Sequence, residues 1–205
     1  MTRFILSAIF AVFLCQPVFA AVKYDEDTAS VSLTGMTTEF QWAQLAAVFA
    51  GAEVKTVYLD GPGGDYFAGL AIGRLIRQEN VRVIIPGECI SACAFAAMGG
   101  REVIIDGVLL FHRPYRMGVS TMQTIEEIAA EWSEAYYAAV FYAVEMGFPM
   151  RLISHIIANS SPCSFIAVRD LDALRAAPTS IIELPKETDN RCKPIPTRPR
   201  QRPGH

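Results

Sequence analysis

The fold of this chain is decided by the stretch Gly87-Glu88-Cys89-Ile90-Ser91-Ala92-Cys93-Ala94-Phe95-Ala96-Ala97-Met98-Gly99-Gly100. A run rich in β-branched residues, 81–85, precedes it and stops at a Pro-Gly pair. The small residues after Ser91 predict a short helix that ends at the paired glycines. Ser91 is therefore expected at a strand-to-helix corner, beside free backbone N–H groups and the positive end of a helix dipole. That environment stabilises an anion, including the alkoxide of an acyl-transfer intermediate, although a serine at this position can also simply cap the helix.

Length and composition indicate a single globular domain without a nucleic-acid partner. The chain has 205 residues, and 52% of them are hydrophobic, which is enough for a real core. A net charge of −3 gives no basic surface for nucleic acid.

The first twenty residues have the pattern of a secretory signal. Arg3 precedes an apolar run over 4–14, and small residues lead up to Ala20. This pattern predicts a signal peptide over 1–20 that is cleaved after Ala20, and therefore an exported, periplasmic protein. The alternative is an uncleaved membrane anchor formed by residues 4–20, although the apolar run is shorter than a full membrane span.

Strands and helices alternate along the rest of the chain, which predicts an α/β fold with a mostly parallel sheet flanked by helices. The domain is expected over 21–185, with a polar lead-in at 24–29 and a disordered tail rich in proline and arginine over 186–205. The apolar part of one long helix, at 132–144, is expected to be buried against another helix or another subunit. The predicted strands are 31–35, 54–59, 81–85, 102–105, 108–112 and 180–184, and the main predicted helices begin near Thr38, Tyr66, Ser91, 122 and Pro149.

The cysteines suggest disulfide bonds in an exported chain. Removal of the signal leaves four of them, Cys89, Cys93, Cys163 and Cys192, and four cysteines allow three pairings between which the sequence does not choose. Cys89 and Cys93 also have the spacing of two metal ligands on a helix, but no second closely spaced ligand pair follows. No metal and no cofactor are therefore expected.

Three features that are weak singly describe an acyl-transfer site together. The Pro-Gly-Gly sequence ending at Gly64 alone is typical of a turn, and His112 alone is typical of a histidine at the rim of a sheet. In combination with Ser91, they provide a hydroxyl to attack a carbonyl and an imidazole to remove its proton. The N–H groups of Gly64 and Ala92 are the candidates to bind the oxyanion, and glycine at 64 allows a backbone shape that exposes its N–H.

Four blocks resemble, in order and spacing, the Clp-type (ClpP-like) serine proteases of the crotonase superfamily, and most of all their exported, periplasmic-type relatives. The resemblance extends over residues 31–184. It implies spiral ββα units around a parallel sheet, Ser91 as nucleophile, His112 as base, and the N–H groups of Gly64 and Ala92 as the oxyanion hole. Some relatives use a Ser–Lys pair, but no lysine of this chain falls in the blocks. The blocks are Leu59-Asp-Gly-Pro-Gly-Gly64, Ala68-Gly-Leu-Ala71, Cys89-Ile-Ser-Ala-Cys93 and Phe111-His-Arg-Pro114.

The chain departs from that family at the third member of the triad. An aspartate is expected shortly before the segment 165–168, where this chain has no acid. Asp170 and Asp172 come too late in the sequence, and His155 lies in an apolar helical run where a structural role is expected. The third member is therefore unknown, and the candidates to orient His112 are Asn159, Ser161 and Ser164.

The resemblance also bears on partners. Clp-type relatives form stacked rings that ATP-driven unfoldases feed, and an exported protein meets no ATP, so no such unfoldase is expected. The expected substrates are peptides or unfolded polypeptide segments, and a homo-oligomer is a second expectation. The competing interpretation is a catalytically weak or inactive protein that acts as a binding or scaffold component of the cell envelope. Acyl-CoA chemistry is disfavoured by the compartment.

Overall fold

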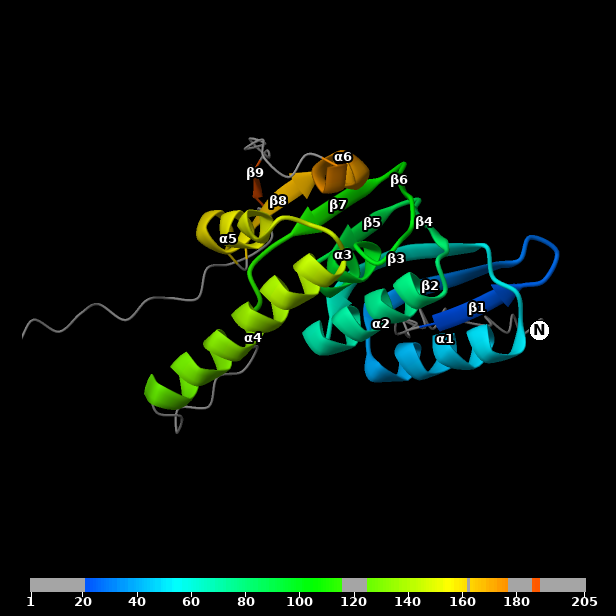
Figure 1. Cartoon of the computed structure of the whole chain (residues 1–205), viewed down its shortest axis with the longest axis horizontal. Coiled ribbons are helices and arrows are strands. Elements are labelled where there is room, and N and C mark those ends of the chain that lie inside the picture. The colour runs from blue at the N-terminus through cyan, green and yellow to red at the C-terminus, as the bar shows by residue number, and fades with distance from the viewer. Residues whose placement is uncertain (1–20, 116–124, 162, 177–185, 189–205) are drawn as a thin grey trace, which may run out of the picture.

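The computed structural model describes residues 21–115, 125–161, 163–176 and 186–188 (Figure 1). The predicted signal peptide, the predicted strand at 180–184 and most of the predicted tail lie outside these residues. No helix in the described part of the chain is long and apolar enough to cross a membrane. In chain order the elements are β1 Ala21–Asp25, β2 Ser30–Thr37, α1 Glu39–Gly51, β3 Thr56–Gly64, α2 Tyr66–Gln78, β4 Arg82–Ile85, β5 Glu88–Ile90, α3 Ala92–Ala97, β6 Val103–Ile105, β7 Val108–Phe111, α4 Ile125–Glu145, α5 Met150–Asn159, β8 Ser164–Val168, α6 Leu171–Ala176 and β9 Lys186–Thr188.

The sheet is organised around β3, which is long enough to pair with two strands on the same side. Its first half pairs with β4, and Gly61 in its second half pairs with Cys89 of β5. On their sides away from β3, β4 pairs with β6 and β5 pairs with β7, and all of these pairs are parallel. Each short strand pair is followed by a helix, β4 and β5 by α3, and β6 and β7 by α4. The predicted α/β fold with a mostly parallel sheet and ββα units is therefore confirmed.

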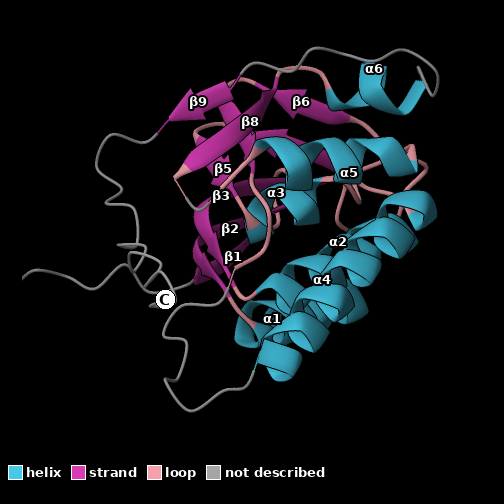
Figure 2. Cartoon of the chain, turned by 90° about the vertical axis from the view of Figure 1, so that its left-hand side faces the viewer, coloured by secondary structure: helices cyan, strands magenta, loops and turns pink. Residues whose placement is uncertain are grey.

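Helices α1, α2 and α4 lie along one side of the sheet (Figure 2). The first two begin at side-chain caps, since Thr38 Oγ1 accepts a hydrogen bond from Gln41 N at 3.2 Å and Asp65 Oδ1 accepts one from Ala68 N at 2.8 Å. These caps satisfy N–H groups that have no partner within the helix. The cap at Asp65 fixes where α2 begins, directly after the glycines that end β3.

Glycines let α2 lie directly against α3, the helix that carries the Ser91 corner. A Cβ atom on Gly69 would collide with the backbone carbonyl of Ala92, and one on Gly99 would collide with the carbonyl of Gly73. From the other side, the fully buried Tyr142 of α4 donates a hydrogen bond to Phe95 O at 2.8 Å. The short helix α3 is therefore held between two longer ones.

The structure corrects several sequence predictions. The expected lead-in at 24–29 begins inside β1, which pairs with β2. The strand β5 was not expected, because its three residues carry no periodic signal. The expected tail begins too early, since Lys186–Thr188 form β9 and pair with β8.

The long apolar helix α4 buries only one of its faces within the chain. Ala139, Tyr142 and Ala143 of α4 are buried within the chain, whereas Tyr137 and Phe141 are exposed. The predicted burial at 132–144 is therefore confirmed for one face of α4, and burial of the other face against another subunit stays a prediction.

The contact between α2 and α3 gives a first prediction. Gly69→Ala forces the α3 backbone away from α2, because the new methyl group and the Ala92 carbonyl cannot occupy the same space. We expect a loss of about 1–3 kcal/mol in the free energy of unfolding, which is typical of overpacking. Urea unfolding of the variant and the wild type measures this difference.

The matched control is Gly51→Ala at the end of α1, where a Cβ atom would meet nothing within 4 Å. Alanine there should be neutral or stabilise the fold by up to about 1 kcal/mol, since it reduces the entropy of the unfolded chain. Equal stability changes in the two variants would show that α2 and α3 are not in close contact at Gly69.

Candidate active site

Three neighbouring parallel strands end at the same edge of the sheet and bring the predicted site residues together. Ile90 of β5 is paired with Leu110 of β7, so Ser91 and His112 directly follow adjacent strands. The glycines that end β3 lie on the other side of Ser91. Adjacent strands are about 4.8 Å apart, and the strand ends enclose a cavity of about 230 Å³. The cavity is lined by Met36, Pro62, Gly64, Tyr66, Ser91, Phe95, His112, Pro114 and Tyr115.

Ser91 occupies the corner between β5 and α3 in an unusual backbone conformation. Its φ is 59° and its ψ is −119°, a region that residues with a side chain rarely adopt. The corner is fixed to the neighbouring strand, because Ser91 N donates to Leu110 O at 2.9 Å. The Ser91 side chain makes no capping hydrogen bond to α3. The interpretation of Ser91 as a simple helix cap is therefore wrong, and its hydroxyl is available to the cavity.

Both glycines at the end of β3 are needed for this arrangement. A Cβ atom on Gly63, whose φ is 90°, would lie 2.7 Å from Ser91 Cβ and 3.0 Å from Ala92 N. Gly64, with φ of 151°, also lines the cavity. The sequence analysis selected Gly64 and missed Gly63, although the Gly-Gly pair was the signal for both. Ala92 is buried at the start of α3, where its N–H has no acceptor within the helix.

A disulfide spans the corner. Cys89 in β5 and Cys93 in α3 are bonded, with their Cα atoms 5.2 Å apart, and both are buried. Cys163 also takes part in a disulfide. Of the three pairings that the sequence left open, the structure therefore selects the one that contains Cys89–Cys93, and this bond ties the strand before Ser91 to the helix after it.

His112 is buried and held by its own neighbour in the chain. Its Nδ1 atom lies 2.7 Å from the carbonyl oxygen of Arg113. Since a carbonyl can only accept, Nδ1 must donate, and Nε2 is then the unprotonated nitrogen that can act as a base. Burial lowers the pKa of His112 below its usual 6.5, and the bond to the Arg113 carbonyl opposes this shift only in part. The rings of Tyr115 and Phe165 lie 5.2 and 5.4 Å from the imidazole.

The carbonyl of Arg113, which accepts from His112 Nδ1, is itself held in place. Pro114 restricts Arg113 to extended conformations, and Ser160 holds its other polar group. Ser160 Oγ accepts from Arg113 N at 2.8 Å and donates to Ile156 O at 2.6 Å. Ser160 is buried at the end of α5 and was not among the predicted candidates. It was missed because its role depends on the backbone N–H of Arg113, which is 47 residues away in the sequence.

Two of the three candidates to orient His112, Asn159 and Ser161, have other partners, and no hydrogen bond between the Ser164 side chain and His112 is found among the described residues. The Asn159 side chain bonds to the His155 carbonyl oxygen at 3.0 Å, and Ser161 Oγ accepts from Cys163 N at 3.3 Å. Asp170 accepts a hydrogen bond from Ala173 N at 2.8 Å and Asp172 accepts one from Val103 N at 2.9 Å, so both carboxylates bind other backbone amides. The hydrogen bonds found among the described residues include none between Ser91 and His112. Such catalytic bonds often tighten only when substrate is bound.

The chain was compared with known proteins. No protein-family model matches it, and no curated protein matches it either. Its fold is similar to that of a ClpP1 mutant from Listeria monocytogenes, which is 20% identical over 62% of this chain and 78% of that chain, with a TM-score of 0.47. It is also similar to a mutant of the membrane-bound stomatin-specific protease 1510-N, 19% identical over 73% and 75% of the two chains, with a TM-score of 0.48. A likeness this weak transfers no residue role, so the roles of Ser91 and His112 depend on the geometry of this chain.

The contact between Ser160 and Arg113 gives a second prediction. Ser160→Ala leaves the N–H of Arg113 without its acceptor, so the Arg113 carbonyl no longer holds His112 in one tautomer. In ¹⁵N spectra of the wild type we expect Nδ1 of His112 to be protonated and Nε2 to be free. In the variant we expect averaged shifts for both nitrogens.

The control is Ser161→Ala, which removes the neighbouring hydroxyl without touching Arg113. Its imidazole spectrum should match that of the wild type. A wild-type His112 protonated at Nε2 would contradict the proposed orientation of the base.

Proposed function

We propose that this chain is an exported serine peptidase that hydrolyses peptides or unfolded polypeptide segments, with Ser91 as nucleophile and His112 as base. One observation carries the proposal. An uncapped serine in a strained backbone conformation shares a cavity with a buried imidazole whose proton is on Nδ1. A capping serine and a rim histidine would need neither feature.

In the proposed reaction, Ser91 Oγ attacks the carbonyl carbon of the substrate while its proton passes to Nε2 of His112. The negative oxygen then lies beside the backbone N–H groups of Gly64 and Ala92, near the positive end of α3. The imidazolium returns its proton to the leaving amine as the C–N bond breaks, which leaves an acyl-serine. A water molecule, deprotonated by Nε2, attacks this ester and releases Ser91.

The proposed enzyme is a slow one. In a triad with an acid, the carboxylate stabilises the imidazolium that forms during the attack. Here the partner of Nδ1 is the neutral carbonyl of Arg113, which accepts a hydrogen bond but adds no negative charge to stabilise the imidazolium. We therefore expect turnover well below that of a complete triad.

Export and the choice of substrate are parts of the same proposal. The pattern at residues 1–20 and the buried Cys89–Cys93 bond both fit an oxidising compartment. In such a compartment no ATP-driven unfoldase is available, so substrates must already be short or unfolded. A homo-oligomer remains part of the proposal and would use the exposed face of α4.

The competing proposal is a binding or scaffold component of the cell envelope. The partner of His112 is neutral, and no hydrogen bond between Ser91 and His112 is found among the described residues. Both observations favour this proposal, since a protein without catalysis needs neither an acid beside His112 nor a bond between Ser91 and His112. The two proposals differ in one measurable property, the reactivity of the Ser91 hydroxyl.

Labelling with a fluorophosphonate probe is the third prediction. The wild type should be labelled, Ser91→Ala should not, and His112→Ala should react at least about 100-fold more slowly, which is the usual contribution of a general base. Ser154→Ala, on the exposed side of α5, is the control and should react like the wild type. A folded wild-type protein that is not labelled would favour the scaffold.

The pH dependence of labelling is the fourth prediction. Protonated His112 cannot accept the proton of Ser91, so the rate should fall as pH decreases through the pKa of His112. Because burial lowers that pKa, the half-maximal rate should lie below pH 6.5, with a plateau above it. Phe165→Ser admits water to the ring and should move the midpoint upward. A midpoint above pH 6.5 in the wild type would contradict the assigned environment of the base.

A further inference from the structure

A second cavity of about 500 Å³ adjoins the one that contains Ser91 and His112. The two share Tyr66, Pro114 and Tyr115 as a common wall. The second cavity lies between the start of α2, the segment after β7 and the helix α4. A peptide bound at Ser91 can therefore place a neighbouring side chain in it.

Four of the eight residues that line this second cavity are aromatic. Tyr66, Phe67, Tyr115 and Trp132 line it, and Phe67, Trp132 and Tyr115 are 52%, 43% and 39% exposed. Tyr66 is fixed in place, because its hydroxyl donates to Ala135 O at 3.2 Å. The face of an aromatic ring is negative and attracts cations, while its surface also packs against an aliphatic chain.

Two carboxylates complete the wall. Asp65 uses one oxygen to cap α2, and Glu134 projects from an exposed position on α4. Neither makes an ion pair with another described residue. No described residue that lines this cavity is cationic.

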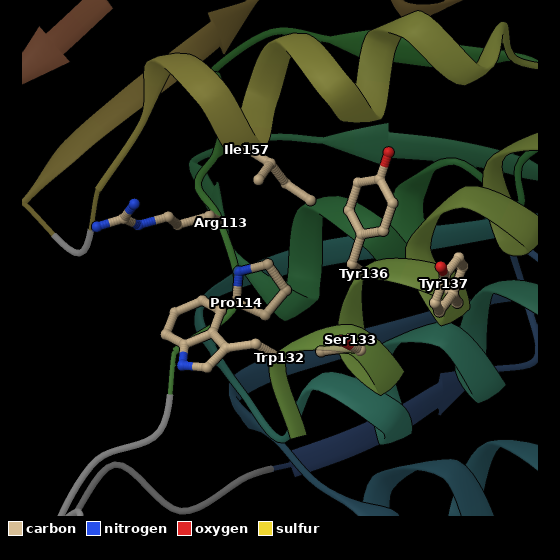
Figure 3. Close-up of a pocket in the computed structure, with 8 residues that line it drawn as sticks. Arg113, Pro114, Trp132, Ser133, Tyr136, Tyr137 and Ile157 are labelled. Carbon is tan, nitrogen blue, oxygen red and sulfur yellow. The ribbon is translucent and has the colours of Figure 1, made fainter. Parts of the chain in front are cut away.

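A positive charge lines a neighbouring cavity. Arg113 lines a smaller space of about 260 Å³ (Figure 3), which shares Pro114, Trp132 and Ala135 with the second cavity. Its guanidinium lies 5.9 Å from the centroid of the Trp132 ring. The lining of the second cavity itself therefore contains two carboxylates and no cationic side chain among the described residues, and the contact with Arg113 shows that the Trp132 ring already accommodates a cation.

We propose that the second cavity binds a lysine or arginine side chain of the substrate, close to the bond that Ser91 attacks. The aliphatic part of that side chain packs against the aromatic rings, and its charged end lies between Asp65 and Glu134. The inference rests on the proposed function for its role in catalysis, because it assigns a substrate class to the same site. Binding does not depend on hydrolysis, so the same cavity would bind segments that carry lysine or arginine at any rate of turnover.

Peptide binding to the full chain carrying Ser91→Ala tests the inference. Pairs of peptides differ at one position, which is lysine in one and norleucine in the other, so that only the ammonium group changes. The position is moved stepwise through the peptide, and dissociation constants are measured by calorimetry. We expect lysine to bind about five- to tenfold more tightly than norleucine at one position, the size of two partly exposed charge contacts.

The variant that tests the carboxylates is Asp65→Asn with Glu134→Gln. Asparagine also caps a helix well, so α2 should keep its start. In this variant the lysine and norleucine peptides should bind about equally. The lysine preference should persist in the control, Glu26→Gln with Asp27→Asn, which removes two exposed charges in the turn between β1 and β2.

Three results would overturn the inference: equal binding of lysine and norleucine peptides at every position, a preference that survives the loss of both carboxylates, and no binding of either peptide. Since the assay uses Ser91→Ala, it does not depend on turnover. A lysine preference without fluorophosphonate labelling would end the peptidase proposal and keep the cation site. Labelling and hydrolysis without a lysine preference would keep the peptidase proposal and end the proposed cation site.

Discussion

The parallel register of β3, β5 and β7 is the constraint on which the rest of the structure depends. Gly61 opposite Cys89 and Ile90 opposite Leu110 place the ends of three strands at one edge of the sheet. Because side chains alternate between the faces of a strand, a slip of one residue would reverse every side chain of the slipped strand. The register is therefore fixed by the buried core beneath it, and the meeting of a glycine pair, a serine and a histidine follows from that core.

The corner at Ser91 is a strained feature that its surroundings hold in place. A φ of 59° is unfavourable for a serine, and its backbone is fixed by Leu110 on one strand and by the bond between Cys89 and Cys93. Gly63 in front and Gly69 behind let two backbones approach it closely. Strain that is held from four sides in this way gives the hydroxyl a defined position, which a flexible loop would not. The rigidity of the corner is thus a property of the fold and not of the serine.

The sequence was enough to predict the fold class and to select Ser91, Gly64 and His112, which line one cavity, because the order and spacing of the three features carry a signal that none of them carries alone. Ser160 and β5 were missed for a common reason. Three residues of strand have no periodicity of their own, and a buried serine that holds a backbone amide far away in the chain leaves no pattern in the sequence. Trp132 and Phe67 have the spacing of core residues, yet they line cavities, since periodicity identifies an apolar face without showing what lies against it.

The hydrogen-bond partner of His112 is compatible with both proposed functions, the peptidase and the binding component. A carbonyl oxygen fixes the tautomer of the imidazole as well as a carboxylate does, but it adds no charge to favour the imidazolium. Burial lowers the pKa of His112, so the free base persists in mildly acidic surroundings. In the proposed reaction, the same burial opposes the imidazolium that forms when Ser91 attacks. Catalysis in that reaction depends on how far a bound substrate compensates that charge, and a site where the compensation is absent would bind peptides without cleaving them.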